Sequence, residues 1–270
     1  MNTEPPSESL VTPSDLKLLR DQIDQLQLAT AEKKQPWYRQ RPSLMSLLAL
    51  VFSAYTFVVT QQRADLQEIR SKKEELRKVL GELISFQESN LALITTVTNP
   101  QQREAVSSLL NAKRGISLQT AEALADELRG KVSSSEYGTL AREKSFTSDF
   151  NKAEMYFLEA TIAARDNNPK ATALRDVGVF YFQPTRLRDL GKARDYFGKS
   201  IEVSTAGEDD YSIYTTGYTY EAWGLWELQN GLLSEGKAKL QNAREYYTKI
   251  KPPNMLGQWA LESLEKRTPR

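Results

Sequence analysis

The sequence predicts an all-α fold with three parts: a single transmembrane helix, a coiled-coil-like stalk helix and a C-terminal α-solenoid of paired helices. An uncharged run of 18 residues lies near the N-terminus, heptads of aliphatic residues follow it, and a pattern of small and aromatic residues recurs in the second half. No window shows the alternation that is typical of a half-buried strand. The expected segments are 1–41 (a tail with a short amphipathic helix), 42–62 (the transmembrane helix), 63–98 (the coiled-coil-like helix), 99–133 (linker helices) and 134–270 (the helical repeats with a capping helix).

The N-terminal tail is expected to contain one short amphipathic helix. The segment Thr12-Pro13-Ser14-Asp15 combines a hydroxyl cap, a proline in the first turn and an acid three residues after the cap, which is typical of a helix start. The helix should end near Lys33-Lys34. Its two heptads are too few for an autonomous coiled coil. Two alternatives therefore stay open: a helix that binds a partner, or a marginal helix that is mostly solvated. Its apolar residues are spaced by three and four: Leu16, Leu19, Ile23 and Leu26.

The uncharged run Ser43–Thr60 predicts a membrane-spanning helix. The 21 residues between Arg41 and Arg63 suffice to cross a hydrocarbon layer of roughly 30 Å. A buried helix in a soluble core would be shorter, and the apolar part of a signal peptide would have only about 7–15 residues. Basic residues are concentrated on the N-terminal side, so the positive-inside rule predicts a cytoplasmic N-terminus. The C-terminal domain would then lie across the membrane, in the periplasm of a bacterium.

The heptads after this run predict a helix that self-associates through residues 63–98. Its seam is mainly aliphatic, and a homodimer would bury it. A helix that lies against the C-terminal domain would show a similar pattern, so this alternative stays open. Thr98-Asn99-Pro100 should end the helix, because proline displaces the residue before it from helical geometry. Two short helices, separated by Arg114-Gly115-Ile116-Ser117, are expected to follow. The aliphatic seam residues are Leu66, Ile69, Leu76, Leu80 and Leu83.

A two-part pattern then occurs three times, at spacings that range from 37 to 46 residues. The first parts are Tyr137-x-x-Leu140-Ala141, Leu174-x-x-Val177-Gly178 and Tyr220-x-x-Trp223-Gly224. The second parts are Ala153-x-x-x-Phe157-x-x-Ala160, Ala193-x-x-x-Phe197-x-x-Ser200 and Gly236-x-x-x-Leu240-x-x-Ala243. The pattern resembles the tetratricopeptide repeat, although its spacing is irregular and the second unit carries an insertion at 183–185. A last helix, Met255–Lys266, should cover the end of the stack.

The resemblance implies a concave face, lined by the first helix of each unit, that holds a peptide or a partner helix. An aromatic ridge on the third unit would extend this face. Aromatic residues at helical spacing are more often core, which is the expectation for Trp223 and Trp226. For Arg142 and Arg175, a solvated position and a carboxylate-binding clamp remain alternatives. The residues that the resemblance places on this face are Arg142, Arg175, Val179, Phe182, Tyr218, Glu221 and Leu225, with Tyr211 and Tyr214 on the ridge.

Composition argues against an enzyme. The chain has no Cys and no His, which excludes thiol catalysis, Ser-His arrangements and the common zinc sites. Its 36 basic and 35 acidic residues argue against a nucleic-acid binder. Gly231–Ala238 approaches a phosphate loop but has Ala where the motif needs Ser or Thr. We therefore expect no cofactor and no metal.

The function expected from these features is that of a membrane-anchored scaffold, or an assembly or holdase factor, that binds a protein or peptide. The alternative is a transmembrane signalling or complex-assembly subunit that links an N-terminal partner to the C-terminal domain. A membrane-bound hydrolase is a third reading, which the residue inventory disfavours.

Overall fold

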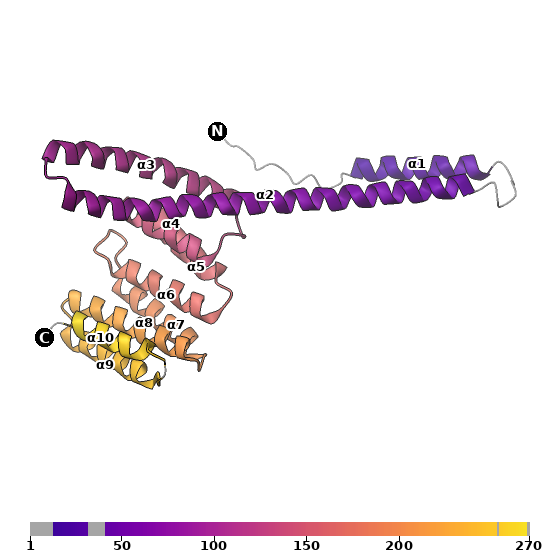
Figure 1. Cartoon of the computed structure of the whole chain (residues 1–270). Coiled ribbons are helices and arrows are strands. Elements are labelled where there is room, and N and C mark those ends of the chain that lie inside the picture. Colours follow the sequence, from indigo (N-terminus) through magenta and orange to yellow (C-terminus); the bar gives the residue numbers. More distant parts are fainter. Residues whose placement is uncertain (1–12, 32–40, 253, 269–270) are drawn as a thin grey trace. The chain divides into compact units, whose positions relative to one another are not determined.

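The computed structural model describes residues 13–31, 41–252 and 254–268 of the chain. These residues form helices and connecting turns and no strand, which confirms the predicted all-α class. The helices are α1 (Pro13–Ala31), α2 (Arg41–Thr96), α3 (Pro100–Glu127), α4 (Ser134–Phe146), α5 (Phe150–Ala163), α6 (Asn167–Phe182), α7 (Leu190–Thr205), α8 (Asp210–Gln229), α9 (Leu233–Lys249) and α10 (Leu256–Arg267). The chain divides into two compact units, Met1–Leu66 and Gln67–Arg270, and α2 contributes to both (Figure 1).

The prediction of a transmembrane helix over 42–62 is wrong. Within the described part of the chain, no helix combines the length and the apolar character needed to cross a membrane. Described side chains in α2 begin at Ser46, and 18 residues counted from there already include Gln61, Gln62 and Arg63. The predicted single-pass topology, membrane localisation, cytoplasmic N-terminus and periplasmic C-terminal domain all depended on this helix and are corrected with it.

Helix α1 confirms the start that its sequence predicts, because it begins at Pro13. Its apolar residues Leu19, Ile23 and Leu26 are exposed. The helix ends at Ala31, and the expected end near Lys33-Lys34 lies outside the described residues. Both alternatives for this helix, a partner-binding and a solvated one, therefore stay predictions.

The second half of α2 packs inside its own chain. Leu76 and Leu83 have no exposed surface, and they belong to a core that also contains Leu118 of α3 and Leu140 of α4. Ion pairs strengthen the contact: one joins Lys72 Nζ to Glu127 Oε2 at 3.0 Å. The seam residues Leu76, Leu80 and Leu83 therefore pack as expected for the second alternative, a helix that lies against the C-terminal domain.

Helix α3 is continuous, so the two short helices predicted for this region are wrong. Asn99 caps its first turn by accepting a hydrogen bond from the Gln101 amide at 3.0 Å, and Pro100 occupies the first position. These residues confirm the predicted break after α2. Gly115 does not interrupt α3, because a single glycine costs a helix only about 1 kcal/mol relative to alanine.

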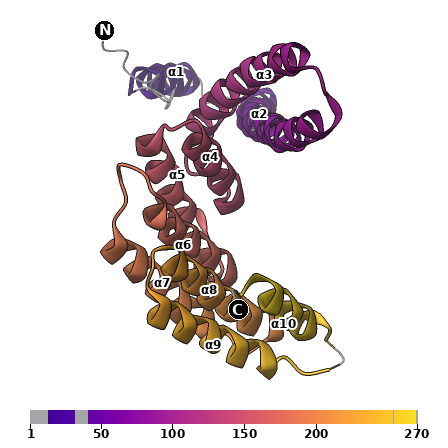
Figure 2. The ribbon, with the colours of Figure 1, turned by 90° about the vertical axis from the view of Figure 1, so that its left-hand side faces the viewer.

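Helices α4 to α10 form a stack of three pairs, α4/α5, α6/α7 and α8/α9, followed by α10 (Figure 2). The paired helices approach closely at small residues, as the pattern predicts. A Cβ atom at Gly224 would lie 2.9 Å from the Gly236 carbonyl oxygen of the facing helix. Ala153 and Ala193 have no exposed surface. Helix α10 confirms the expected terminal helix, which contributes Ala260 and Leu264 to the core of the last pair.

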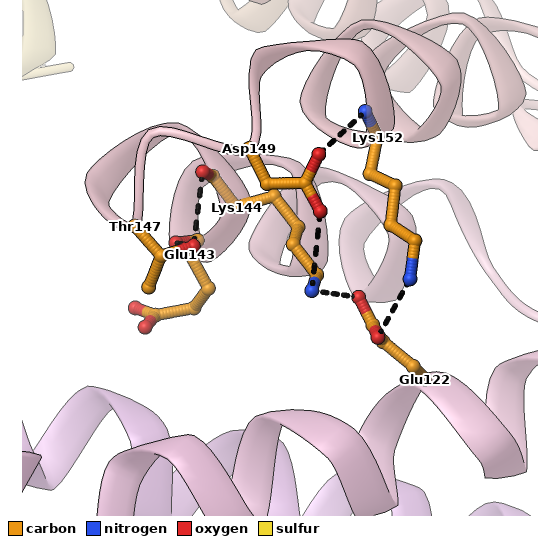
Figure 3. Close-up of polar contacts among 6 residues, drawn as sticks. All are labelled: Glu122, Glu143, Lys144, Thr147, Asp149 and Lys152. Atoms are coloured by element: carbon orange, nitrogen blue, oxygen red, sulfur yellow. Dashed lines mark hydrogen bonds and ion pairs between the residues drawn. The ribbon is translucent and has the colours of Figure 1, made fainter.

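A network of charged side chains fastens α3 to the first pair of the stack. Glu122 of α3 forms ion pairs with Lys144 of α4 and, at 3.1 Å, with Lys152 of α5 (Figure 3). Lys144 lies between Glu122 and Asp149, whose Oδ2 is 3.6 Å from Nζ. Burial and the nearby Lys152 lower the pKa of Lys144, while Asp149 acts in the opposite direction. The first pair of helices is thereby held to the α2–α3 hairpin of the same unit.

Candidate functional site

Two adjoining pockets lie along the first helices of the three pairs. The first pocket has a volume of about 430 Å³ and the second of about 350 Å³. Asp176 and Val179 of α6 line both, so the pockets form one groove across α4, α6 and α8. The first pocket is lined by Arg142, Ser145, Phe146, Phe150, Phe157, Asp176, Val179, Gln183, Pro184 and Thr185. The second is lined by Arg175, Asp176, Val179, Tyr218, Glu221, Ala222, Leu225, Trp226, Gln229 and Arg267.

The first pocket is mainly apolar. Phe146, Phe150 and Phe157 come from the two helices of the first pair, and Pro184 comes from the connection between α6 and α7. A hydrogen bond of 3.1 Å from the Ser145 hydroxyl to Gln183 Oε1 ties that connection to α4. The insertion that makes the second repeat irregular therefore forms one wall of this pocket.

The second pocket is polar and aromatic. The Arg175 guanidinium lies over the Tyr218 ring, 4.5 Å from the ring centroid. Trp226 stacks on Phe182, so its indole is held in place from the core side. Arg267 enters the pocket from α10, which places a second guanidinium beside Glu221. This pocket can thus offer cationic hydrogen-bond donors next to aromatic surface.

Asp176 connects the charges of the two pockets. Arg142 Nη1 donates a hydrogen bond of 3.1 Å to its Oδ2, whereas Arg175 Nε lies 3.9 Å from Oδ1. Burial raises the pKa of Asp176, and the two arginines act against this change by favouring the charged form. Arg142 is the hydrogen-bonded partner of this carboxylate, whereas Arg175 forms an ion pair with it that is too long for a hydrogen bond.

Glu221 forms the buried floor of the second pocket. Its Oε2 accepts a hydrogen bond of 2.7 Å from the Tyr247 hydroxyl, and Arg267 Nη1 lies 3.3 Å from Oε1. Burial and the Glu221 carboxylate raise the pKa of Tyr247, so its hydroxyl stays protonated and continues to donate. Both carboxylate oxygens of Glu221 are therefore already engaged within the chain.

Most of the face predicted from the resemblance does line the groove. Arg175, Val179, Tyr218, Glu221 and Leu225 share the second pocket, and Arg142 and Val179 share the first.

Three predicted residues lie elsewhere. Phe182 is 1% exposed and packs against Phe197 and Trp226 in the core. Tyr211 is exposed and lines neither pocket. Tyr214 stacks on Tyr218 and tilts against Tyr247, so it supports the pocket wall from behind. The predicted ridge is thus reduced to Tyr218.

Asp176, Trp226 and Arg267 line the second pocket although the sequence did not predict them there. Asp176 directly follows the predicted Arg175, and Trp226 directly follows the predicted Leu225, so both had a local signal. Arg267 had none, because it reaches the pocket from the terminal helix, whose role was expected to be only that of a cover. Within the described residues, no cluster of three or more acidic side chains could hold a metal ion.

No relative was found. Comparisons with protein-family models, with curated proteins and with solved structures all returned no match. The resemblance to the tetratricopeptide repeat accordingly stays a prediction.

Proposed function

We propose that this protein is a non-enzymatic scaffold, or an assembly or holdase factor, that binds a peptide or a partner helix in the groove across α4, α6 and α8. The observation that carries the proposal is the gathering of Arg175, Val179, Tyr218, Glu221 and Leu225 around one pocket. These residues come from two helices of different pairs and lie up to 50 positions apart in the chain.

The chemistry of the groove suits a polypeptide. One end is apolar and can accept an aliphatic or aromatic side chain, while the other combines guanidinium groups with Tyr218 and Trp226. Sites of this kind use buried apolar anchors for affinity and a few fixed polar groups for orientation. The absence of His and Cys from the chain supports the non-enzymatic part of the proposal.

A second candidate function is an adaptor that binds one partner through α1 and another in the groove. The exposed Leu19, Ile23 and Leu26 of α1 favour it, because an amphipathic helix commonly presents such residues to a partner. Deletion of residues 13–31 should then abolish binding of one partner and leave binding in the groove unchanged.

The decisive experiment for the groove is a peptide selection. The full chain is immobilised and exposed to a random library of peptides of about ten residues, which span roughly 33 Å when extended. We expect specific sequences to be retained. Val179→Arg should abolish their retention, because Val179 lines both pockets.

The matched control is Ile162→Arg. Ile162 is exposed on α5 and lines neither pocket, so the same charge there should leave retention unchanged. Retention of the same peptides by Val179→Arg, or of none by the unaltered chain, would refute binding in the groove.

A further inference from the structure

The first half of α2 carries large apolar side chains that are exposed. Leu48 is 48% exposed, and Phe52 and Tyr55 are each 68% exposed. The described part of the first unit does not cover them, and Leu19 and Ile23 of α1 are exposed in the same way. Exposed apolar surface of this extent marks a site of association, because its burial is favourable.

These side chains continue the aliphatic seam of α2 towards its N-terminus in the same phase. Because α2 is one uninterrupted helix (Figure 1), alternating steps of four and three residues stay on one face. Further along the helix, Leu76 and Leu83 on this face are buried in the core of their own chain. The seam thus has its partner inside the chain in the second half of α2 and needs one in the first half. Counted back from Leu66, the seam positions are Gln62, Val59, Tyr55, Phe52 and Leu48.

Charged residues beside the seam favour a second copy of the chain as that partner. Asp65 lies one position before the seam residue Leu66, and Arg70 lies four positions after it; both are exposed. In a parallel two-stranded coiled coil, these two flanking positions meet across the interface, so Asp65 of each copy contacts Arg70 of the other. The same residues cannot pair within α2, because they lie about 140° apart around its axis. The helix is therefore complementary in charge to its own copy at this point.

We propose that α2 associates with the α2 of a second copy, parallel and in register, through the face that runs from Leu48 to Arg70. Val51 and Val58 flank the seam and widen its apolar surface, since they are 56% and 52% exposed. Gln62 is the polar residue within the seam, and a polar seam residue fixes the register of two helices. This interface replaces the dimer expected over residues 63–98, because the chain's own core occupies the second half of that seam. It goes beyond the proposed function, which concerns a different surface.

The oligomeric state of the full chain is the first test. Gel filtration coupled to light scattering should give twice the mass of a single chain, and dilution should lower the measured mass towards that of one chain. A monomeric mass at every concentration would refute the proposal.

Phe52→Glu and Phe57→Glu form a matched pair of variants. Both phenylalanines lie in the first half of α2, and they are 68% and 71% exposed. Phe52 lies in the seam, whereas Phe57 points about 140° away from it. Phe52→Glu should weaken the association at least about hundredfold, because it places unpaired charges in an apolar interface. Phe57→Glu should change it less than about threefold. Equal effects of the two variants would refute the seam, since no particular face of α2 would then be involved.

A charge exchange tests the contact between Asp65 and Arg70. Asp65→Arg should weaken the dimer about threefold to tenfold, because like charges then face each other at both ends of the pair. Adding Arg70→Asp to the same chain should restore the affinity, because opposite charges meet again. If the double variant is as weak as Asp65→Arg, the two residues do not meet across the interface.

Disulfide trapping reports the orientation, without background because the chain has no Cys. In a parallel pair in register, the Cys of Gln62→Cys faces its twin at a distance that a disulfide spans, so mild oxidation should link the dimer covalently. The control is Gln67→Cys on the outer face of α2, which should stay unlinked. The opposite result for either variant would contradict the parallel arrangement.

Loss of association is separable from loss of folding. The unit Gln67–Arg270 has a core of its own, so substitutions in the seam before it should leave the free energy of unfolding of this unit unchanged. Urea denaturation of each variant checks this.

Discussion

At the residue scale, the interior of the stack contains ionised side chains as well as apolar ones. Glu227 of α8 is almost fully buried, and its carboxylate accepts two hydrogen bonds from Arg194 of α7, at 2.7 and 2.9 Å. The Trp223 indole donates a third, at 2.9 Å. Burial alone would raise the pKa of Glu227, but the bonds from Arg194 and Trp223 outweigh it and hold the pKa below its ordinary value.

We predict that Glu227→Gln lowers the free energy of unfolding by an amount that depends on pH. A carboxyl group whose pKa is lowered by folding stabilises the folded chain at pH values above its unfolded pKa of about 4.3. That contribution is lost as the pH falls through the lower folded pKa. At pH 7 the variant should lose about 1–3 kcal/mol of unfolding free energy.

Urea denaturation at several pH values measures this difference. The gap between Glu227→Gln and the unaltered chain should narrow below about pH 4, because the native carboxyl becomes protonated as well. If the difference in unfolding free energy stays constant down to acid pH, the ionised form of Glu227 does not stabilise the fold.

Residue-level prediction of the site succeeded where a position in the repeat determines the direction of a side chain. Val179, Tyr218 and Glu221 lie on the face that the pattern assigns to them. Phe182 does not, because it lies at the very end of α6, where its ring turns towards Phe197 in the core. No pattern could reveal that Arg142 rather than Arg175 donates the hydrogen bond to Asp176, since this depends on which arginine comes close enough to the carboxylate.

At the element scale, the glycines show how differently one residue type is used. Gly224 lies in the middle of α8, where a Cβ would lie 2.8 Å from Leu240 Cγ and 2.9 Å from the Gly236 carbonyl oxygen. Gly115 lies in the middle of α3 with no atom within 4 Å of that position. The first permits two backbones to touch, whereas the second only reduces the intrinsic stability of its helix.

The same substitution should therefore have opposite effects at these two positions. Gly224→Ala should lower the free energy of unfolding by about 1–3 kcal/mol, because α8 and α9 must move apart. Gly115→Ala should raise it by about 0.5–1 kcal/mol, because alanine has the higher helix propensity. Urea denaturation of both variants measures these two changes in the free energy of unfolding. If Gly224→Ala stabilised the protein, the close approach of α8 and α9 would be contradicted.

Element boundaries with a chemical cause were predictable. The proline and the capping asparagine at the start of α3 mark it correctly, and α10 falls within a residue of its expected limits. The break expected at Gly115 does not occur, because glycine lowers helix stability without excluding the helical conformation. Whether the aliphatic seam of α2 meets a second copy or its own chain could not be decided from spacing, since both partners require the same periodicity.

At the scale of the whole molecule, the unit Gln67–Arg270 is one folded body in which the hairpin of α2 and α3 shares a core with the helical stack. We predict that Leu76→Ala lowers the unfolding free energy of this unit by about 2–5 kcal/mol, because the side chain has no exposed surface.

The control is Leu66→Ala on the same helix. This leucine is 55% exposed, so its removal should change the stability by less than about 0.5 kcal/mol. Chemical denaturation of the full chain compares the two. Equal effects would mean that α2 is not a part of the folded core.

Architecture was predictable to the extent that it follows from local periodicity. The repeated small and aromatic residues indicated paired helices over the C-terminal half, and α4 to α9 have that arrangement. The placement at a membrane was wrong, because no helix among the described residues combines the length and the apolar character that a membrane span needs. An uncharged run of 18 residues did not suffice, and the predicted span reached its full length only by including Gln61 and Gln62.

Arrays of stacked helix pairs commonly change length when a unit is duplicated or lost, because each unit contacts only its neighbours. Here the buried glutamates are matched one by one to donors on particular helices. Removing the pair α6/α7, or inserting another pair between α7 and α8, would leave Glu227 inside the protein without Arg194, at a cost of several kcal/mol. The order of the second and third pairs is therefore fixed by an internal charge. The pairings are Arg77 with Glu136, Arg114 with Glu143, Arg194 with Glu227, and Arg267 with Glu221.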